Sequence, residues 1–218
     1  VACTGLKMKF SIVTISYNQS EFLRQCIESV LSQEVAEIEY IVVDPGSTDG
    51  SREVIDEYAD RIIRVYEPDN GPADGLNKGF SRATGQICAF INSDDYFLPG
   101  AFKAVEDHFQ STSFFHFFTG HGFQLRKGRL LPIVPLRITM KRLRLMNFPL
   151  FQQGTFFSLQ LFKRAGGFNC RNKTCWDGEL FLNFLQLGAA HKILRRKVAV
   201  FEMKAGNPLS ARSFDQAS

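Results

Sequence analysis

Short apolar runs alternate with stretches of helical spacing through the first half of this 218-residue chain. The apolar runs span residues 10–15, 40–43, 61–66 and 86–91. Between the first two runs, Leu23, Cys26 and Ile27 recur at helical intervals, which predicts a helix with one buried face. Parallel strands need connections of helix length, so this alternation predicts an α/β domain with a mainly parallel sheet.

Composition and charge exclude several classes of protein. With 44% hydrophobic and 22% charged residues the chain is long enough to bury a core. A net charge of +4 is too small to predict a nucleic-acid partner. No apolar run approaches the roughly 20 residues that cross a bilayer, and residues 1–9 lack the apolar centre of a secretory signal. Five cysteines without a C-x-x-C pair favour a reducing compartment, so we expect a cytoplasmic protein.

Polar and acidic residues follow each predicted strand. They are Ser16, Tyr17 and Asn18 after the first, Asp44 after the second, Glu67 and Asp69 after the third, and Asp94 and Asp95 after the fourth. In such sheets ligands bind beyond the carboxyl ends of the strands. Each residue alone is an ordinary turn or capping residue. Several carboxylates brought together, however, become protonated or gain a cation.

The residue types narrow the choice of cation. Acidic oxygen ligands without His or Cys favour Mg²⁺ or Mn²⁺, which usually bind substrate phosphates as well. The four histidines lack the H-x-x-H or H-E-x-x-H spacing of a zinc site. A divalent ion held by one or two carboxylates is suited to neutralise a diphosphate, so the sequence predicts a nucleotide-linked substrate.

A series of motifs in fixed order carries a family resemblance. It consists of ISYN at 15–18, SVLSQ at 29–33, IVVDPGSTDG at 41–50, DNGPADGLNKG at 69–79, ATG at 83–85 and NSDD at 92–95. Together these resemble the family 2 glycosyltransferases of the GT-A fold. The resemblance implies a mixed, mainly parallel sheet flanked by helices, with a small acceptor-side extension. Residues 8–110 would form the nucleotide-sugar-binding half and 111–205 the acceptor-binding half. Residues 1–7 would be an expression remnant or upstream extension, and 206–218 a tail.

The resemblance also implies roles for the acids that end the strands. Asp44 would contact the nucleotide base, and the Ser16, Tyr17 and Asn18 turn would border the same pocket. Asp94 would face the ribose or the ion. Asp95 would be the main metal ligand of the D-x-D-like motif, whose first acid is here replaced by Ser93.

Four further residues are candidates for donor binding by the same resemblance. Asp49 lies in a loop that the family keeps acidic, although it can equally cap the helix from residue 51. Asp74, Asn77 and Lys78 would line the donor site, with Lys78 available to a phosphate. The alternative for these three is a solvated helix face.

An inverting sugar transfer needs a cation on the departing diphosphate and a carboxylate that takes the proton of the incoming hydroxyl. In the segment WDGEL at 176–180, Asp177 aligns with the family's base. Trp176 stands where a second acid often lies, which leaves Asp177 and Glu179 both open. Asp177 as a mere helix cap is a further alternative. Many members of the family have a histidine towards the C-terminus that coordinates the metal. At that place this chain has Met203 and Lys204.

Residues 136–148 form the segment whose role the sequence leaves most open. Read as a helix, Arg137, Lys141 and Arg144 lie beside an apolar stripe. Such a helix could rest on an anionic membrane surface or bind an acidic or lipid-diphosphate acceptor. The alternative is a helix that packs on the core and exposes its charged face to solvent.

The expected function is a Mn²⁺- or Mg²⁺-dependent inverting glycosyltransferase of the hexosyl or hexosaminyl class. Its donor would be a nucleotide-diphosphate sugar, UDP first. Its acceptor would be a carbohydrate or a lipid-linked molecule in cell-surface polysaccharide or glycolipid synthesis, with the inner membrane face as a second location. The alternative is a non-catalytic nucleotide-sugar-binding module.

Overall fold

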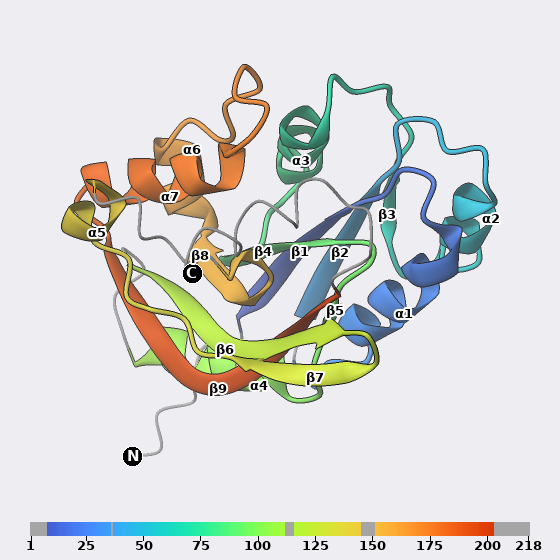
Figure 1. Ribbon diagram of the computed structural model, residues 1–218. Coiled ribbons are helices and arrows are strands. Elements are labelled where there is room, and N and C mark those ends of the chain that lie inside the picture. Colours follow the sequence, from blue (N-terminus) through green and yellow to red (C-terminus); the bar gives the residue numbers. More distant parts are fainter. Residues whose placement is uncertain (1–7, 36, 112–115, 145–150, 203–218) are drawn as a thin grey trace, which may run out of the picture.

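A mixed sheet runs through the computed structural model, which describes residues 8–35, 37–111, 116–144 and 151–202 (Figure 1). Its strands are β1 (Lys9–Ile15), β2 (Glu37–Val43), β3 (Ile63–Val65), β4 (Ile87–Asn92), β5 (Tyr96–Phe97), β6 (His116–Arg126), β7 (Arg129–Ile133), β8 (Thr155–Ser158) and β9 (Ala190–Glu202). Within the described chain they form one sheet in the order β3-β2-β1-β4-β8-β6-β9-β5, and β7 pairs with β6.

Helices cover both faces of this sheet. One face carries α1 (Ser20–Leu31), α2 (Ser51–Asp56) and α4 (Ala101–Gln110), and the other carries α3 (Pro72–Phe80), α6 (Leu159–Arg164) and α7 (Trp176–Gln186) (Figure 1). Each layer buries its own core, around Leu23, Ile27 and Phe102 on the first face and around Phe80, Phe157 and Phe181 on the second. This is the α/β fold with a mainly parallel, helix-flanked sheet that the sequence predicts.

The first four strands bring their carboxyl ends to one edge. β1 pairs in parallel with both β2 and β4, and Ile15 lies opposite Val43 on one side and Asn92 on the other. β3 extends the same parallel set beside β2. The residues that follow β1, β2 and β4 therefore meet at one edge, as the alternating pattern predicts.

The second half of the chain adds strands of mixed direction to the other side of β4. β8 is antiparallel to β4 and β6, while β6 runs parallel to β9 and forms a hairpin with β7. The short 3-10 helix η1 (Gln152–Gly154) precedes β8. The Phe151 ring packs so closely here that a Cβ atom at Gly122 or Gly154 would collide with it. These two glycines therefore let η1 approach the sheet.

The segment 136–148 is helical over a single short stretch in the described part, α5 (Met140–Arg144). Before it, Ile138 is buried, and its backbone N–H donates to His191 Nδ1 at 2.7 Å. Residues 145–150 lie outside the described residues, as do 1–7, Met203, Lys204 and the 206–218 tail. No helix of the described chain has the length and apolar character needed to cross a membrane.

Candidate active site

A cleft of about 960 Å³ opens at the carboxyl ends of the parallel strands. Its walls come from both halves of the chain. The polar and aromatic wall residues are Ser16, Tyr17, Gln19, Asp69, Asn92, Ser93 and Asp94 from the first half, and Gln124, Phe151, Gln152, Gln153, Thr174, Trp176, Asp177 and Phe201 from the second. The register of β1, β2 and β4 explains why the first set gathers at one place.

The two adjacent acids after β4 have different surroundings. Asp94 lines the cleft, whereas Asp95 is only 1% exposed. Asp95 Oδ2 accepts from Gln153 Nε2 at 2.9 Å, and Oδ1 accepts from the backbone N–H of Glu202 at 2.9 Å. Burial, reinforced by the charge of Asp94, raises the pKa of the Asp95 carboxyl well above its ordinary value. The structure thus places Asp94 on the wall and Asp95 directly behind it.

The oxygen chemistry of this acid pair fits a hard divalent cation. The described residues bring together no group of three or more His, Cys, Asp or Glu side chains that could hold a metal. The donors to Asp95 are neutral amide groups, and none of the ion pairs among the described residues involves it. Mg²⁺ and Mn²⁺ sites commonly use one or two carboxylates and complete their shell with substrate phosphates and water. The pair therefore suits an ion that binds together with a diphosphate.

Asp44 directly follows β2, and one oxygen of its carboxylate accepts several hydrogen bonds. Its Oδ1 accepts from the backbone N–H groups of Gly46 and Ser47 at 2.9 and 2.8 Å and from Arg52 Nε at 3.0 Å. Its Oδ2 is buried and has no hydrogen-bond partner among the described residues, and the same holds for Ser16 Oγ. An unsatisfied buried polar atom is costly, so both atoms are candidates for contact with a polar ligand. Ser16 lines the cleft, whereas Asp44 is not among the residues that line it, and the role of Asp44 toward the donor stays a prediction.

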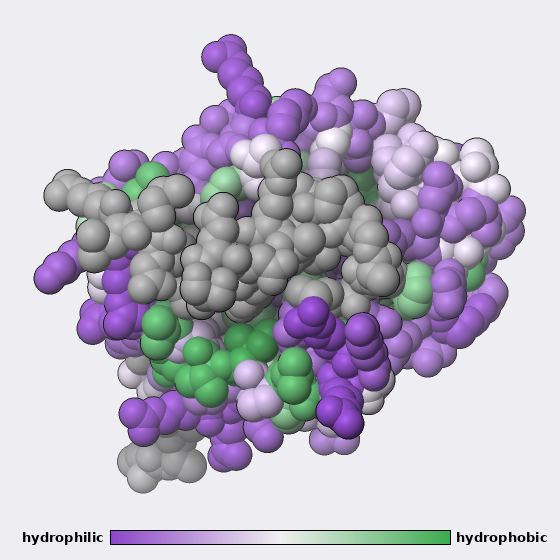
Figure 2. Space-filling model, viewed as in Figure 1, coloured by the Kyte–Doolittle hydropathy of each residue, from purple (hydrophilic) through white to green (hydrophobic). Residues whose placement is uncertain are grey.

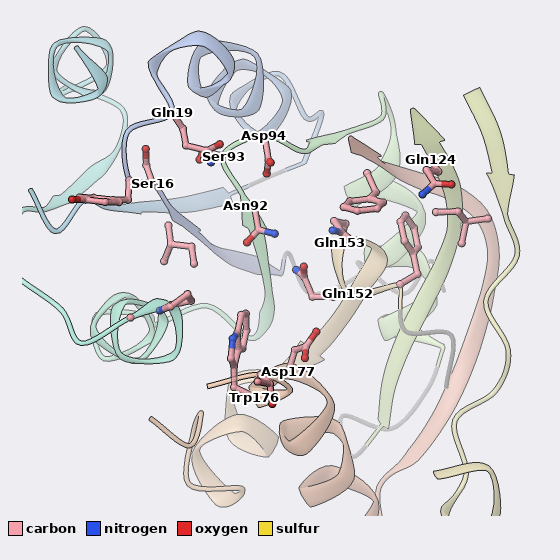
Figure 3. A pocket seen from close by; sticks show the side chains of 18 of the residues that line it. Ser16, Gln19, Asn92, Ser93, Asp94, Gln124, Gln152, Gln153, Trp176 and Asp177 are labelled. Atoms are coloured by element: carbon pink, nitrogen blue, oxygen red, sulfur yellow. Dashed lines mark hydrogen bonds between the residues drawn. The ribbon is translucent and has the colours of Figure 1, made fainter. Parts of the chain in front are cut away.

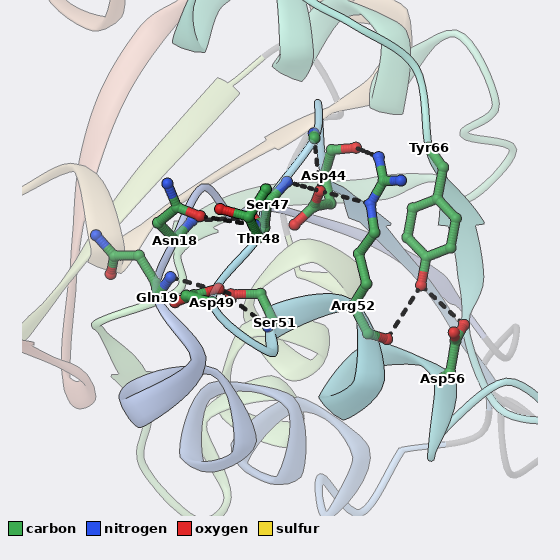
Figure 4. A network of polar contacts seen from close by, with 11 residues as sticks. Asn18, Gln19, Asp44, Ser47, Thr48, Asp49, Ser51, Arg52, Asp56 and Tyr66 are labelled. Carbon is green, nitrogen blue, oxygen red and sulfur yellow. Dashed lines mark hydrogen bonds and ion pairs between the residues drawn. The ribbon is translucent and has the colours of Figure 1, made fainter.

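Arg52 holds Asp44 from the first turn of α2, as Figure 4 shows. Its guanidinium also lies 4.6 Å from the centre of the Tyr66 ring, whose hydroxyl donates to Asp56 at 2.8 Å. We expect Arg52→Gln to raise the KM for the donor about tenfold with little change in kcat, because it loosens Asp44 without touching the reacting atoms. Arg64→Gln is the matched control, since Arg64 forms an exposed ion pair with Asp56. Equal donor KM values for the two variants would contradict this role.

Asp49 and Asn18 tie together the loops that follow β1 and β2 (Figure 4). The Asp49 carboxylate accepts from the backbone N–H of Ser20 at 2.9 Å and of Ser51 at 3.0 Å. These bonds lower the pKa of Asp49 to about 2. Asn18 Oδ1 accepts from the backbone N–H of Thr48 at 2.9 Å. Neither residue lines the cleft, so their part in donor binding stays a prediction.

The three polar residues of α3 are engaged within the protein. Asp74 accepts from the backbone N–H of Asn70 and pairs with Lys78, which also donates to the Pro68 carbonyl. Asn77 bonds both backbone polar groups of Phe168, at 2.8 and 2.9 Å. Asp74, Asn77 and Lys78 are not among the cleft residues, and their role toward the donor also stays a prediction.

The two candidate bases at the start of α7 point in different directions. Asp177 lines the cleft beside Trp176, and burial raises the pKa of its carboxyl. Glu179 is held outside by the side-chain amides of Asn172 and Asn169, at 2.6 and 2.9 Å, and these bonds lower its pKa. The helix begins after Cys175, so Asp177 lies inside its first turn and is not the N-cap residue. Figure 3 shows Asp177 and Asp94 on opposite sides of the cleft.

Comparison with known proteins places the chain in a family. A family model described as Glycosyl transferase family 2 matches residues 11–159. The chain belongs to this glycosyltransferase family. The uncharacterized glycosyltransferase alr2836 of Nostoc is 36% identical over 109 residues, which are 48% of this chain and 34% of that protein. TuaG of Bacillus subtilis, named a putative teichuronic acid biosynthesis glycosyltransferase, is 33% identical over 129 residues, 57% of this chain and 51% of its own length. The chain thus spans about a third to a half of these relatives.

Solved structures of glycosyltransferases share the fold. Staphylococcus aureus TarS (residues 1–349) with UDP-GlcNAc superposes with a TM-score of 0.73 and 19% identity, covering 94% of this chain and 61% of TarS. The mannosyltransferase PcManGT of Pyrobaculum calidifontis, with GDP-Man and Mn²⁺, gives a TM-score of 0.68 and 16% identity, covering 89% of this chain and 57% of its own. The predicted GT-A fold is therefore confirmed.

The cleft also contains residues to which the sequence alone gave no role. Gln153 fixes Asp95, and Gln19 accepts from Ser93 Oγ at 3.3 Å (Figure 3). Gln124 of β6 and residues 132–135 form the wall on the side of the second half. The sequence signal for Gln153 was its place in a QQG motif before β8, whereas nothing in the run PIVP at 132–135 marks a cleft wall.

Proposed function

We propose that this chain transfers a hexosyl or hexosaminyl group, with inversion, from a nucleotide-diphosphate sugar to an acceptor hydroxyl. One observation carries the proposal. A single cleft holds the carboxylate of Asp94, from the turn after β4, on one side and the carboxylate of Asp177, from α7, on the other. Inverting displacement needs a leaving-group site and a base on opposite faces of the sugar, and membership of glycosyl transferase family 2 supports the same chemistry.

The nucleotide base would lie beside β1 and β2. Asp44 Oδ2 is a buried acceptor and Ser16 Oγ a buried hydroxyl, both without described partners. Uracil offers an imide N–H flanked by two carbonyls, so it could bond both an acceptor such as Asp44 Oδ2 and a hydroxyl such as Ser16 Oγ, and UDP is our first expectation. UDP-GlcNAc is bound in TarS and GDP-Man in PcManGT, which supports nucleotide-diphosphate donors without choosing between them.

Asp94 and Asp95 are the residues that would hold Mn²⁺ or Mg²⁺ together with the donor diphosphate. When bound, such an ion would neutralise the charge that develops on the departing diphosphate. Gln153 and the Glu202 backbone N–H hold Asp95 in place behind the wall. The Mn²⁺ in PcManGT supports the choice of ion.

Asp177 would accept the proton of the acceptor hydroxyl. It lies on the wall formed by the second half, next to Trp176, whereas Glu179 is outside the cleft and bonded to two asparagines. Burial raises the pKa of Asp177, which makes the carboxylate a stronger base once ionised. Only the ionised form can take a proton, so we expect kcat to fall on acidification at a higher pH than for a solvent-exposed Asp. A pH profile of kcat measures this acid limb.

The acceptor would be a carbohydrate or a lipid-linked molecule of cell-surface polysaccharide synthesis. The name of TuaG, a putative teichuronic acid biosynthesis glycosyltransferase, supports this class. The wall of the second half combines amides, such as Gln124 and Gln152, with the Trp176 and Phe201 rings. Aromatic faces beside hydrogen-bonding amides are suited to a sugar, which has both apolar faces and hydroxyl edges.

Donor binding and transfer test the proposal together. The thermal shift of the chain is measured with UDP-, dTDP- and GDP-sugars, with and without Mn²⁺, followed by transfer assays on a broad panel of acceptors. We expect one nucleotide class to raise Tm strongly and only in the presence of the ion. Donor binding with neither transfer nor donor hydrolysis would instead indicate a nucleotide-sugar-binding module. Absence of any donor binding would contradict both.

A further inference from the structure

The strand β7 and the residues after it expose an unusual amount of apolar surface. Among the described residues, five of the seven large hydrophobic side chains that are exposed lie in this part of the chain. They are Leu130, Leu131, Val134, Leu136 and Met140, with Val134 at 62% and Leu130 at 51% exposure. Figure 2 shows apolar surface gathered on the face in view, where β6 and β7 run in Figure 1, with hydrophilic surface beside and below it. Single exposed leucines are normal, but a contiguous group marks a contact surface.

The same part of the chain is basic and has no acids. Its exposed cationic residues are Arg126, Lys127, Arg129, Arg137 and Lys141. None of them forms an ion pair with a described acid. The sequence contains no Asp or Glu between Asp107 and Asp177. Residues 126–141, called the basic–apolar strip below, therefore present cations and leucines side by side.

The basic–apolar strip is continuous with the cleft. Pro132, Ile133, Val134 and Pro135 belong to the strip and also line the cleft, on the wall formed by the second half. β7 pairs with β6 such that Ile133 lies opposite Gly122, close to Gln124 on the same wall. A partner that covers the strip would therefore lie at the acceptor side of the cleft.

We propose that the basic–apolar strip docks on an anionic lipid bilayer, and that the acceptor is a lipid-linked molecule presented in the headgroup layer. The second part rests on the proposed function. A bilayer with anionic headgroups matches both features of the strip, because cations meet lipid phosphates and leucines enter the boundary with the acyl chains. An acidic polymer would match the cations but would leave the leucines in water. A second copy of this chain would bring two cationic surfaces face to face, which like-charge repulsion disfavours.

Vesicle binding tests the docking. The chain is floated with vesicles of phosphatidylcholine alone and of phosphatidylcholine mixed with phosphatidylglycerol. We expect binding only to the anionic vesicles, weakening as salt is added. Leu130→Ser combined with Leu131→Ser removes an exposed leucine from each face of β7, so it should weaken binding at least about tenfold whichever face meets the lipid. Neither residue lines the cleft, so transfer to a soluble acceptor should be unchanged.

A matched pair of charge variants separates the strip from general positive charge. Arg129→Gln with Lys141→Gln removes two cations from the strip, and we expect it to weaken binding to anionic vesicles about tenfold. Lys163→Gln with Arg164→Gln removes two exposed cations from α6, and binding should be retained. Circular dichroism and Tm check that each variant is folded. If the double serine variant does not fold, the two charge variants still test the docking.

Several outcomes would overturn the docking. They are equal binding to neutral vesicles, no binding to anionic vesicles at physiological salt, and an equal loss of binding in the α6 variant. A dimer that dissociates on Leu130→Ser with Leu131→Ser would assign the strip to self-association, and binding of an acidic polysaccharide in place of vesicles would assign it to such a polymer. The test is independent of catalysis, because Asp177→Asn should leave vesicle binding unchanged. A chain that binds anionic vesicles but transfers no sugar would contradict the proposed function and leave the docking intact.

Discussion

Replacing Asp177 by Asn is expected to lower kcat for sugar transfer by about a thousandfold, within the range that general base catalysis contributes. Asn has nearly the same shape but cannot accept the proton of the acceptor hydroxyl. Asp177 lies on the wall of the cleft across from Asp94, so the change should leave the Kd of the donor within about twofold. Initial rates at saturating donor and acceptor give kcat, and calorimetric titration with the nucleotide sugar gives Kd.

Glu179→Gln provides the matched control for this variant. Glu179 belongs to the same turn of α7, but its carboxylate bonds Asn169 and Asn172 outside the cleft. We expect it to keep kcat near the wild-type value, with at most a modest loss of stability. A nearly unchanged rate in Asp177→Asn would show that Asp177 is not the base. A large loss of kcat in Glu179→Gln, with Asp177→Asn active, would give the role to Glu179.

The parallel half of the sheet could be predicted from the sequence because its pattern is local. Each β-branched run is followed by a helical spacing, and parallel strands joined in this way must place their carboxyl ends together. Hence the strand-and-helix alternation by itself assigns Ser16, Asp44 and Asp94 to one edge. The register of Ile15 with Val43 and Asn92 confirms that arrangement.

The second half of the site depends on contacts between residues far apart in the chain, which no local pattern reports. Gln153 and the backbone of Glu202 bond Asp95 across 58 and 107 residues. Asn77 bonds Phe168 across 91 residues, so a polar position on α3 that could face a donor instead joins two parts of the protein. Polarity alone does not tell whether a side chain meets a ligand or another segment.

The choice between Asp177 and Glu179 shows the same limit on a smaller scale. Side chains two positions apart on a helix point about 160° away from each other, so only one of them can face a given cleft. Deciding which one requires the orientation of α7, and that depends on the packing of Leu180, Phe181 and Phe184 in the core. The sequence therefore leaves two candidate acids, and the packing of α7 places only Asp177 on the wall of the cleft, which is the reason that we propose it as the base.

Replacing Asp94 by Asn is expected to weaken Mn²⁺ binding in the presence of UDP by more than about a hundredfold. Changes in residues that merely support metal ligands commonly cost ten- to a hundredfold, and Asp94 would be a ligand itself. Asp94 is the carboxylate of the pair that lines the cleft, where a diphosphate could share the ion with it. Titration of Mn²⁺ into the chain with saturating UDP, followed by electron paramagnetic resonance of free Mn²⁺, measures the affinity.

The variant Asp95→Asn tests whether Asp95 binds the ion itself or only positions Asp94. Asp95 is buried, and its two oxygens accept from Gln153 and from the Glu202 backbone N–H, so the structure allows it to bind the ion or to position Asp94. If Asp95 is a ligand of the ion, Asp95→Asn should weaken Mn²⁺ binding far more than Gln153→Leu does. If Asp95 only holds Asp94 in place, the two variants should weaken Mn²⁺ binding by similar and smaller factors. Asp107→Asn, an exposed acid on α4 paired with Lys103, is the control that should change nothing. Unchanged Mn²⁺ affinity in both Asp94→Asn and Asp95→Asn would show that these two acids do not bind the cation. The two adjacent carboxylates after β4 would then need another explanation.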